Sequence, residues 1–217
     1  MRAEDRIYTF LCALFVVIIV IGNLIYQKFV TLPLFSLHAL EVSVGVLLYP
    51  LTYLLTDLIS EFYGKERAGF CVRLGILMNI IAVSIIFAMD HLEATDWSLI
   101  DSHTFHKVFG MYGIAFAGST VACYISQTID IRLYLWIKKL TNGRHLWLRN
   151  NISTATSLLV DTFIVINFMC FFGAIPWERM IAIVSNSYTF KLFFTIAATP
   201  IFYLCVAIIR RLLKAPG

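Results

Sequence analysis

Six long apolar runs limit what this chain can fold into more than any other feature of its sequence. A helix of about 20 apolar residues crosses the hydrocarbon core of a bilayer. Six stretches have that length: 7–27, 41–62, 68–89, 108–129, 150–173 and 190–209. The sequence therefore predicts an all-α integral membrane protein, in which residues 1–217 form one domain of six transmembrane helices. With three helices in each half, any internal repeat would consist of two inverted halves.

The composition supports a membrane protein and excludes several soluble classes. Apolar residues make up 60% of the chain and charged residues only 14%, whereas soluble domains carry about 25% charged residues. This excludes a soluble nucleic-acid-binding protein, a disordered chain and a secreted disulfide scaffold. The five cysteines lie in the apolar runs without close spacing, and no hydrolase or metalloprotease motif occurs. We therefore expect no enzyme activity, no cofactor and no metal site, and the lipid bilayer as the surrounding medium.

The distribution of lysine and arginine predicts the orientation of the spans, because cytoplasmic loops are enriched in these residues. If the N-terminus, the 63–67 loop, the 130–149 segment and the C-terminal tail share one side, that side holds thirteen of the seventeen basic residues. The other side holds only Lys28, Lys107, Arg179 and Lys191. Both termini are therefore expected in the cytoplasm.

Polar residues form a stripe along the second apolar run. Tyr49, Tyr53, Asp57 and Glu61 follow at intervals of four, which places them on one face of a helix. An ionisable group at the centre of a membrane helix costs about 2.5–3.5 kcal/mol and needs a partner or a hydrated cavity. Asp57 is therefore a candidate ligand-binding acid, with an ion pair to Arg73 as the structural alternative. Glu61 is either a further ligand residue or a solvated helix end.

The fifth run contains the strongest candidate, Asp161, on one helix face with Ser153 and Ser157. Asp161 follows Arg149 by twelve residues, or about 18 Å of helix, which places it near the middle of a hydrocarbon core of about 30 Å. No lysine or arginine nearby on the same helix can neutralise it. We therefore predict that Asp161 binds substrate or a proton, and that Asp161→Asn inserts and folds normally but loses uptake.

Amide side chains add candidate hydrogen-bonding groups. Gln127 shares a helix face with Asp130 in the fourth run, and its amide can both donate and accept. Its structural alternative is a hydrogen bond between helices. Asn150 and Asn151 begin the fifth run, where each is either a ligand contact or a helix cap. Asn23 lies toward the outer end of the first run, where we expect it to anchor that helix at the interface.

Three stretches of the chain together resemble one bacterial family of six-helix transporters. They are residues 55–64 (LTDLISEFYG), residues 126–130 (SQTID), and residues 146–154 (LWLRNNIST) leading to 160–162 (VDT). The family is the queuosine precursor transporters, also described as "putative vitamin uptake transporters". The likeness covers about residues 8–211, in order and at matching helix positions. One departure is Leu158, at a position where the family often has glutamine.

The resemblance implies import, across the bacterial plasma (inner) membrane, of 7-deazaguanine precursors of the tRNA nucleoside queuosine, namely the cyano or aminomethyl base or queuine. The polar residues suit such a ligand. One carboxylate can accept hydrogen bonds from both its ring NH and its exocyclic amine. Its carbonyl needs an amide donor and its ring an aromatic face, and the candidates for these contacts are Gln127, Asn150, Asn151, Tyr49, Tyr53 and Tyr124.

Two other function classes fit the sequence. One is a substrate-binding membrane subunit that docks onto a separate ATP-driven module, as in vitamin-type importers. Uptake by the single chain in liposomes would exclude it. The other is a structural or assembly factor, which thermal stabilisation by a 7-deazaguanine would exclude. The sequence leaves open which precursor is preferred, whether protons or sodium ions are coupled, and whether the protein is a monomer or a homodimer.

Overall fold

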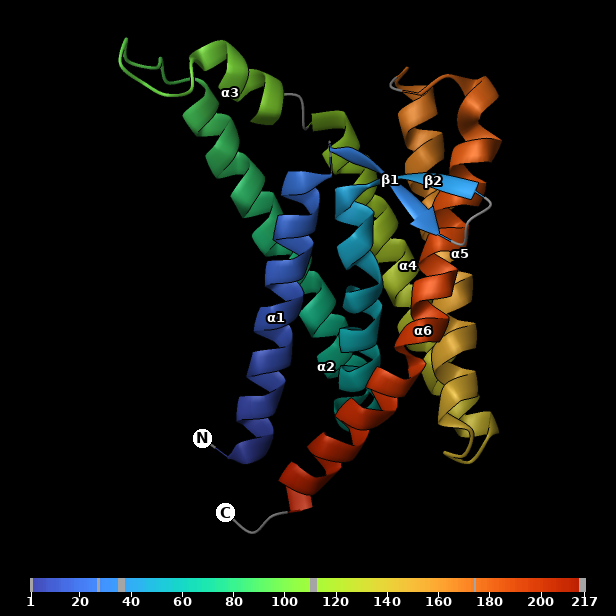
Figure 1. Ribbon diagram of the computed structural model, residues 1–217. Helices are drawn as coiled ribbons and strands as arrows, with labels where there is room; N and C mark the ends of the chain where they lie inside the picture. The colour runs from blue at the N-terminus through green and yellow to red at the C-terminus, as the bar shows by residue number, and fades with distance from the viewer. Residues whose placement is uncertain (1, 27, 35–37, 110–112, 174, 215–217) are drawn as a thin grey trace.

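The fold is a bundle of long helices with one short β-hairpin (Figure 1). The structure is a computed structural model that describes residues 2–26, 28–34, 38–109, 113–173 and 175–214. Its elements, in chain order, are α1 (Ala3–Ile25), β1 (Phe29–Leu34), β2 (His38–Ser43), α2 (Val44–Asp90), α3 (Ser102–Phe109), α4 (Gly113–Leu140), α5 (Leu146–Phe171), a 3₁₀ turn (Trp177–Arg179) and α6 (Met180–Lys214).

Among the described residues, four helices are long and apolar enough to cross a bilayer: α1, α2, α5 and the helix that includes α6. The helix α4 has 28 residues, but its serine, threonine, glutamine and aspartate residues make it more polar. The many exposed apolar side chains on the outside of the bundle, such as Phe10, Phe87 and Ile181, suit a surface that faces lipid. The chain is therefore a multi-pass helical membrane protein.

Helix α2 is two helical arms joined at Gly64. The backbone of Gly64 has φ 78° and lies outside the helical region, a conformation that glycine adopts without a steric penalty. Residues 44–63 run from the hairpin toward the end where both termini lie, and residues 65–90 return toward α3 (Figure 1). The two arms correspond to the predicted second and third runs.

The hairpin corrects the prediction of an all-α fold. Strands β1 and β2 pair antiparallel from Phe29 with Ser43 to Leu34 with His38. Each strand has six residues, too few to cross a membrane, and pairing satisfies their backbone groups instead. The hydroxyl of Ser43 donates to the carbonyl of Tyr26 and accepts from the amide of Gly45. The hairpin thereby ties the end of α1 to the start of α2.

The helix ends also differ from the predicted runs. The second run was expected from residue 41, whereas α2 begins at Val44 after the hairpin. The fourth run crosses from α3 into α4, with residues 110–112 outside the described part of the chain. The last run, 190–209, lies inside α6, which begins ten residues earlier at Met180. This earlier start places Lys191 three turns inside the helix.

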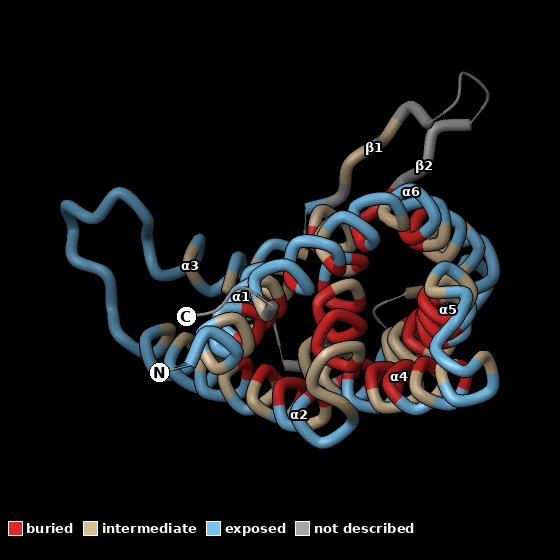
Figure 2. The backbone as a smooth tube through the Cα atoms, turned by 90° about the horizontal axis from the view of Figure 1, so that it is seen from below, coloured by how far each residue is buried: buried red, intermediate tan, exposed pale blue. Residues whose placement is uncertain are grey.

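Buried residues of α2, α4 and α5 face the inside of the bundle, while their outer faces are exposed (Figure 2). The largest buried side chains include Phe15, Tyr53, Tyr134, Phe190 and Phe202. Buried polar side chains lie among them, including several carboxyl groups. This polar interior contains the candidate site.

Candidate functional site

A cavity of about 290 Å³ lies between α1, α2, α4, α5 and α6. It extends from Tyr26 and Ser43 near the hairpin to Thr52 and Asp161 within the helices. Most of its lining is apolar, and the polar lining residues include Asn23, Ser43, Tyr49, Thr52, Asn79, Ser119, Thr120, Asp161, Ser187 and Lys191. An apolar pocket with a few polar groups is the usual form of a small-molecule site, and roughly 300–1,000 Å³ is the usual volume.

Asp161 and Lys191 form a buried ion pair on the wall of this cavity. The Nζ of Lys191 lies 2.9 Å from Oδ2 of Asp161, and the two side chains are 6% and 1% exposed. Lys191 also donates to Thr162 Oγ1 at 3.0 Å and lies 4.5 Å from the centre of the Tyr49 ring. The Tyr49 hydroxyl donates to Asp161 Oδ1 at 2.6 Å, and Ser126 Oγ approaches the same atom at 3.4 Å.

One prediction about these residues is wrong, because Lys191 was expected on the outer side and is buried in the bundle. The expectation for Asp161 was that no lysine or arginine nearby on its own helix could neutralise it. The cation that neutralises Asp161 comes from α6, so inspection of α5 alone could not find it. A signal was present, because Ser187, Lys191, Thr195 and Thr199 follow at intervals of four, a polar stripe like that of the second run.

Below the cavity, a group of neutral hydrogen bonds joins α2 to α4. The amide of Gln127 accepts from Thr56 Oγ1 at 2.8 Å and donates to Thr52 Oγ1 at 3.2 Å. The hydroxyl of Tyr53 donates to Ser126 Oγ at 2.8 Å. Gln127 and Tyr53 are fully buried and do not line the cavity. In this conformation Gln127 forms hydrogen bonds between two helices, which was the structural alternative to ligand binding.

One helical turn further along α2, Asp57 faces Asp130 of α4. Both residues are fully buried. Thr154 Oγ1 donates to Asp57 Oδ2 at 3.4 Å, and Ser157 is a neighbour of Asp130. The alternative ion pair between Asp57 and Arg73 is wrong, because Arg73 is exposed while Asp57 is enclosed.

The last member of the α2 stripe, Glu61, joins four helices. Its carboxylate lies 2.7 Å from Arg149 Nη2 of α5, 2.8 Å from Lys138 Nζ of α4 and 3.3 Å from Arg210 Nη2 of α6. The hydroxyl of Tyr134 donates to the same carboxylate at 3.2 Å. Arg149 is 1% exposed. Glu61 is therefore the centre of an ion-pair network and not a solvated helix end. We call these five residues the Glu61 network.

Three other predicted residues lie away from the cavity. Tyr124 is 49% exposed on α4 and does not line the cavity in this conformation. Asn151 donates to Trp147 O at 2.8 Å and to Thr199 Oγ1 at 3.0 Å, which ties α5 to α6. Asn150 is buried near the start of α5.

Asn23, expected at the interface, instead lines the cavity and accepts from Ser119 Oγ at 3.0 Å.

A cavity that extends into a membrane-embedded bundle, as far as a buried ion pair, is the arrangement of a membrane transporter. The chain belongs to the family described as "putative vitamin uptake transporter", whose pattern matches residues 43–205. It is similar to a "probable queuosine precursor transporter" of Bacillus subtilis (strain 168), with 30% identity over 169 residues. The match covers 77% of this chain and 73% of the relative. No solved structure matches the chain.

Proposed function

We propose that this protein imports 7-deazaguanine precursors of queuosine across the bacterial inner membrane and binds them in the cavity beside Asp161 and Lys191. The observation that carries the proposal is the buried ion pair on the cavity wall. Burial of a charged pair at this depth costs free energy of desolvation. Binding of a polar ligand that offers both hydrogen-bond donors and an acceptor accounts for its presence on the cavity wall. The name of the Bacillus subtilis relative supports this ligand class.

The pair and its neighbours are complementary to a guanine-like edge. The carboxylate of Asp161 accepts hydrogen bonds from the ring NH and the exocyclic amine, while the ammonium group of Lys191 donates to the ring carbonyl. The ring of Tyr49 lines the same cavity and offers a face for stacking. The remaining predicted contacts, Gln127, Asp57, Asp130 and Ser157, are buried outside the cavity lining and are not among the proposed ligand contacts.

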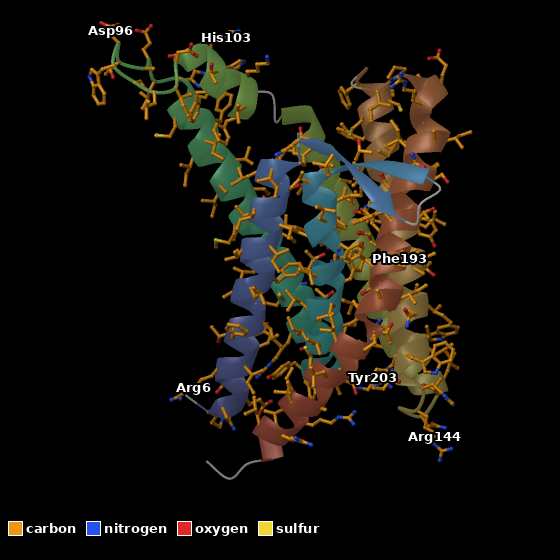
Figure 3. The ribbon with its side chains drawn as sticks, in the orientation of Figure 1. Arg6, Asp96, His103, Arg144, Phe193 and Tyr203 are labelled. Atoms are coloured by element: carbon orange, nitrogen blue, oxygen red, sulfur yellow. The ribbon has the colours of Figure 1, made fainter. Side chains whose placement is uncertain are left out.

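The proposed topology has six membrane passes with both termini in the cytoplasm. Gly64 divides α2 into two arms of 20 and 26 residues, each long enough to span. Arg6 and Arg144 lie at the end of the molecule that holds the termini, and Asp96 and His103 lie at the opposite end (Figure 3). With Lys191 inside the bundle, the basic residues assigned to the outer side are Lys28, Lys107 and Arg179, which strengthens the charge asymmetry.

The same topology indicates which side of the membrane the cavity faces in this conformation. The cavity extends toward the hairpin, the end assigned to the outside. The Glu61 network joins α2, α4, α5 and α6 on the other side of Asp161. We therefore propose that this conformation presents the site to the outer side, with the Glu61 network as the contact that holds the cytoplasmic side together.

The proposal is tested by binding and uptake with purified protein. The cyano base, the aminomethyl base and queuine are each added to protein in detergent, with guanine and adenine as comparison ligands. At least one precursor should raise the melting temperature and displace the others, and adenine should not. Uptake of that precursor by liposomes that contain this chain alone would exclude a subunit that needs an ATP-driven module. No stabilisation and no uptake with any of the three precursors would overturn the proposal.

A further inference from the structure

Among the residues whose burial is described, Asp57 and Asp130 are the most enclosed acidic groups. Both have 0% exposed surface, and their carboxyl groups face each other across the contact between α2 and α4. Neither residue lines the cavity. Because two carboxylates in contact away from water repel each other strongly, the pair is stable only when at least one proton lies with it.

Neutral hydroxyl groups of α5 surround the pair. Thr154 donates to Asp57 Oδ2 at 3.4 Å. Asp57 Oδ1 and both oxygens of Asp130 form no well-aligned hydrogen bond with the described residues, although Ser153, Thr154 and Ser157 of α5 lie beside the carboxyl group of Asp130. The hydroxyl of Ser157 is fully buried and lies next to Asp130, again without a well-aligned hydrogen bond among the described residues. Neutral hydroxyl groups do not balance the charge of two buried carboxylates.

The charged and titratable groups that face the pair do not supply a permanent counter-ion. On α5, Arg149 is the cation that faces Asp57, but its guanidinium is bound to Glu61, to the Tyr134 hydroxyl and to Gly143 O. On α2, Tyr53 faces Asp130, and on α4, Tyr134 faces Asp57. Arg210 of α6 reaches Glu61 and not the pair.

The pair lies between the part of α2 that contacts the cavity and the part at the opposite end of the bundle, where it can respond to the solution on either side of the membrane. Asp57 is one helical turn, about 6 Å, from Tyr53 and from Glu61. Tyr53 joins Ser126, which approaches Asp161 at the cavity wall. Glu61 is the centre of the network at the other end. The pair therefore lies between the cavity and the Glu61 network, where opening of either side would expose it to a different solution.

We infer that Asp57 and Asp130 form the binding site for a proton that is transported together with the substrate. This inference rests on the proposed function and names its coupling ion. The proton enters from the outer side, is held between the two carboxyl groups while the transporter is loaded, and leaves to the cytoplasm after the Glu61 network opens. Direct contact of the two carboxyl groups favours a proton over sodium, which needs room for several oxygen ligands around it.

The first test uses the wild-type chain in liposomes with 7-cyano-7-deazaguanine, which is uncharged, so that the membrane potential alone cannot concentrate it. With potassium and valinomycin clamping the potential, an acidic exterior should drive accumulation above the external concentration, and a protonophore should abolish it. A pH-sensitive dye in the lumen should report acidification when the base is added. Accumulation that follows a sodium gradient at equal pH, or uptake that ignores the pH gradient, would overturn the inference.

The second test uses Asp57→Asn and Asp130→Asn, which mimic the protonated pair. Each variant should bind the base within about threefold of wild type and should exchange labelled for unlabelled base across the membrane. Each should lose accumulation driven by the pH gradient, because an amide that cannot release a proton replaces one of the two carboxyl groups that share it. Glu93→Gln, which removes an exposed acid outside the bundle, is the matched control and should accumulate normally.

The outcomes separate the two proposals. If the wild-type chain neither binds nor exchanges the precursors, the proposed function fails. If it exchanges them but no proton moves, only the proton site fails. Loss of binding in both asparagine variants, with normal melting temperature, would assign the acids to the substrate site instead. If the variants do not fold, the dye measurement on the wild-type chain decides.

Discussion

The Nζ of Lys191 on α6 lies 2.9 Å from Oδ2 of Asp161 on α5, and both side chains are more than nine-tenths buried. Thirty residues separate the two positions. The pair neutralises the carboxyl group of Asp161 on the cavity wall and fixes α6 against α5. The pair is both a structural contact and the proposed ligand site. Variants at either residue must therefore be measured for protein stability as well as for precursor uptake.

The first prediction concerns each half of this pair. Lys191→Met should lower stability by about 3–5 kcal/mol, because it leaves Asp161 buried without its cation. Asp161→Asn should also be destabilised, contrary to the expectation from sequence alone, because it leaves the lysine unpaired. The double variant should recover most of the melting temperature but no precursor uptake. Lys139→Met, on an exposed part of α4, is the control, and a Lys191→Met protein that melts and transports like wild type would contradict the assignment.

The second prediction separates stacking from hydrogen bonding at Tyr49. Tyr49→Ala should weaken precursor binding by about 1–3 kcal/mol, the usual contribution of an aromatic ring stacked on a base. Tyr49→Phe keeps the ring and should retain most of the affinity. Tyr124→Ala should bind normally, because this residue lies on the outer surface of α4. Affinities measured by titration check all three, and equal affinity of Tyr49→Ala and wild type would remove Tyr49 from the site.

The third prediction concerns the Glu61 network. Glu61→Gln should lower stability by about 3–5 kcal/mol, because Arg149 would remain buried as an unpaired cation. Arg210→Ala removes a partner of the same carboxylate that is 56% exposed, and should change stability by only about 0–1 kcal/mol. Thermal unfolding in detergent measures both. Similar losses in the two variants would show that burial of Arg149 is not the cause.

The fourth prediction concerns topology. A reporter that is active only outside the cytoplasm should give no signal when fused after Gly217, because both termini are assigned to the basic, cytoplasmic side. The same reporter inserted after Thr95, in the acidic segment between α2 and α3, should be active and serves as the positive control. Signal from the C-terminal fusion would reverse the proposed orientation.

Much of the architecture followed from the sequence, because it depends on local periodicity. Apolar runs about as long as a membrane span identified the helical segments, and spacing of four residues placed Tyr49, Tyr53, Asp57 and Glu61 on one face. All four side chains do point into the bundle, where they contact α4, α5 and α6. The hairpin was missed, since two runs of six residues form strands only by pairing with each other.

Only the tertiary structure decided which polar groups have partners, because those partners come from other helices. The amide of Gln127 is bound by Thr52 and Thr56 of α2, which no spacing within α4 reveals. Lys191 was assigned to the outer surface until α6 proved to begin at Met180. A sequence records which residues share a face of one helix. Packing of four helices, α2, α4, α5 and α6, brought Asp161 to Lys191 and Asp57 to Asp130, because an unpaired charge within the bilayer costs more than the close approach of the helices that neutralise it.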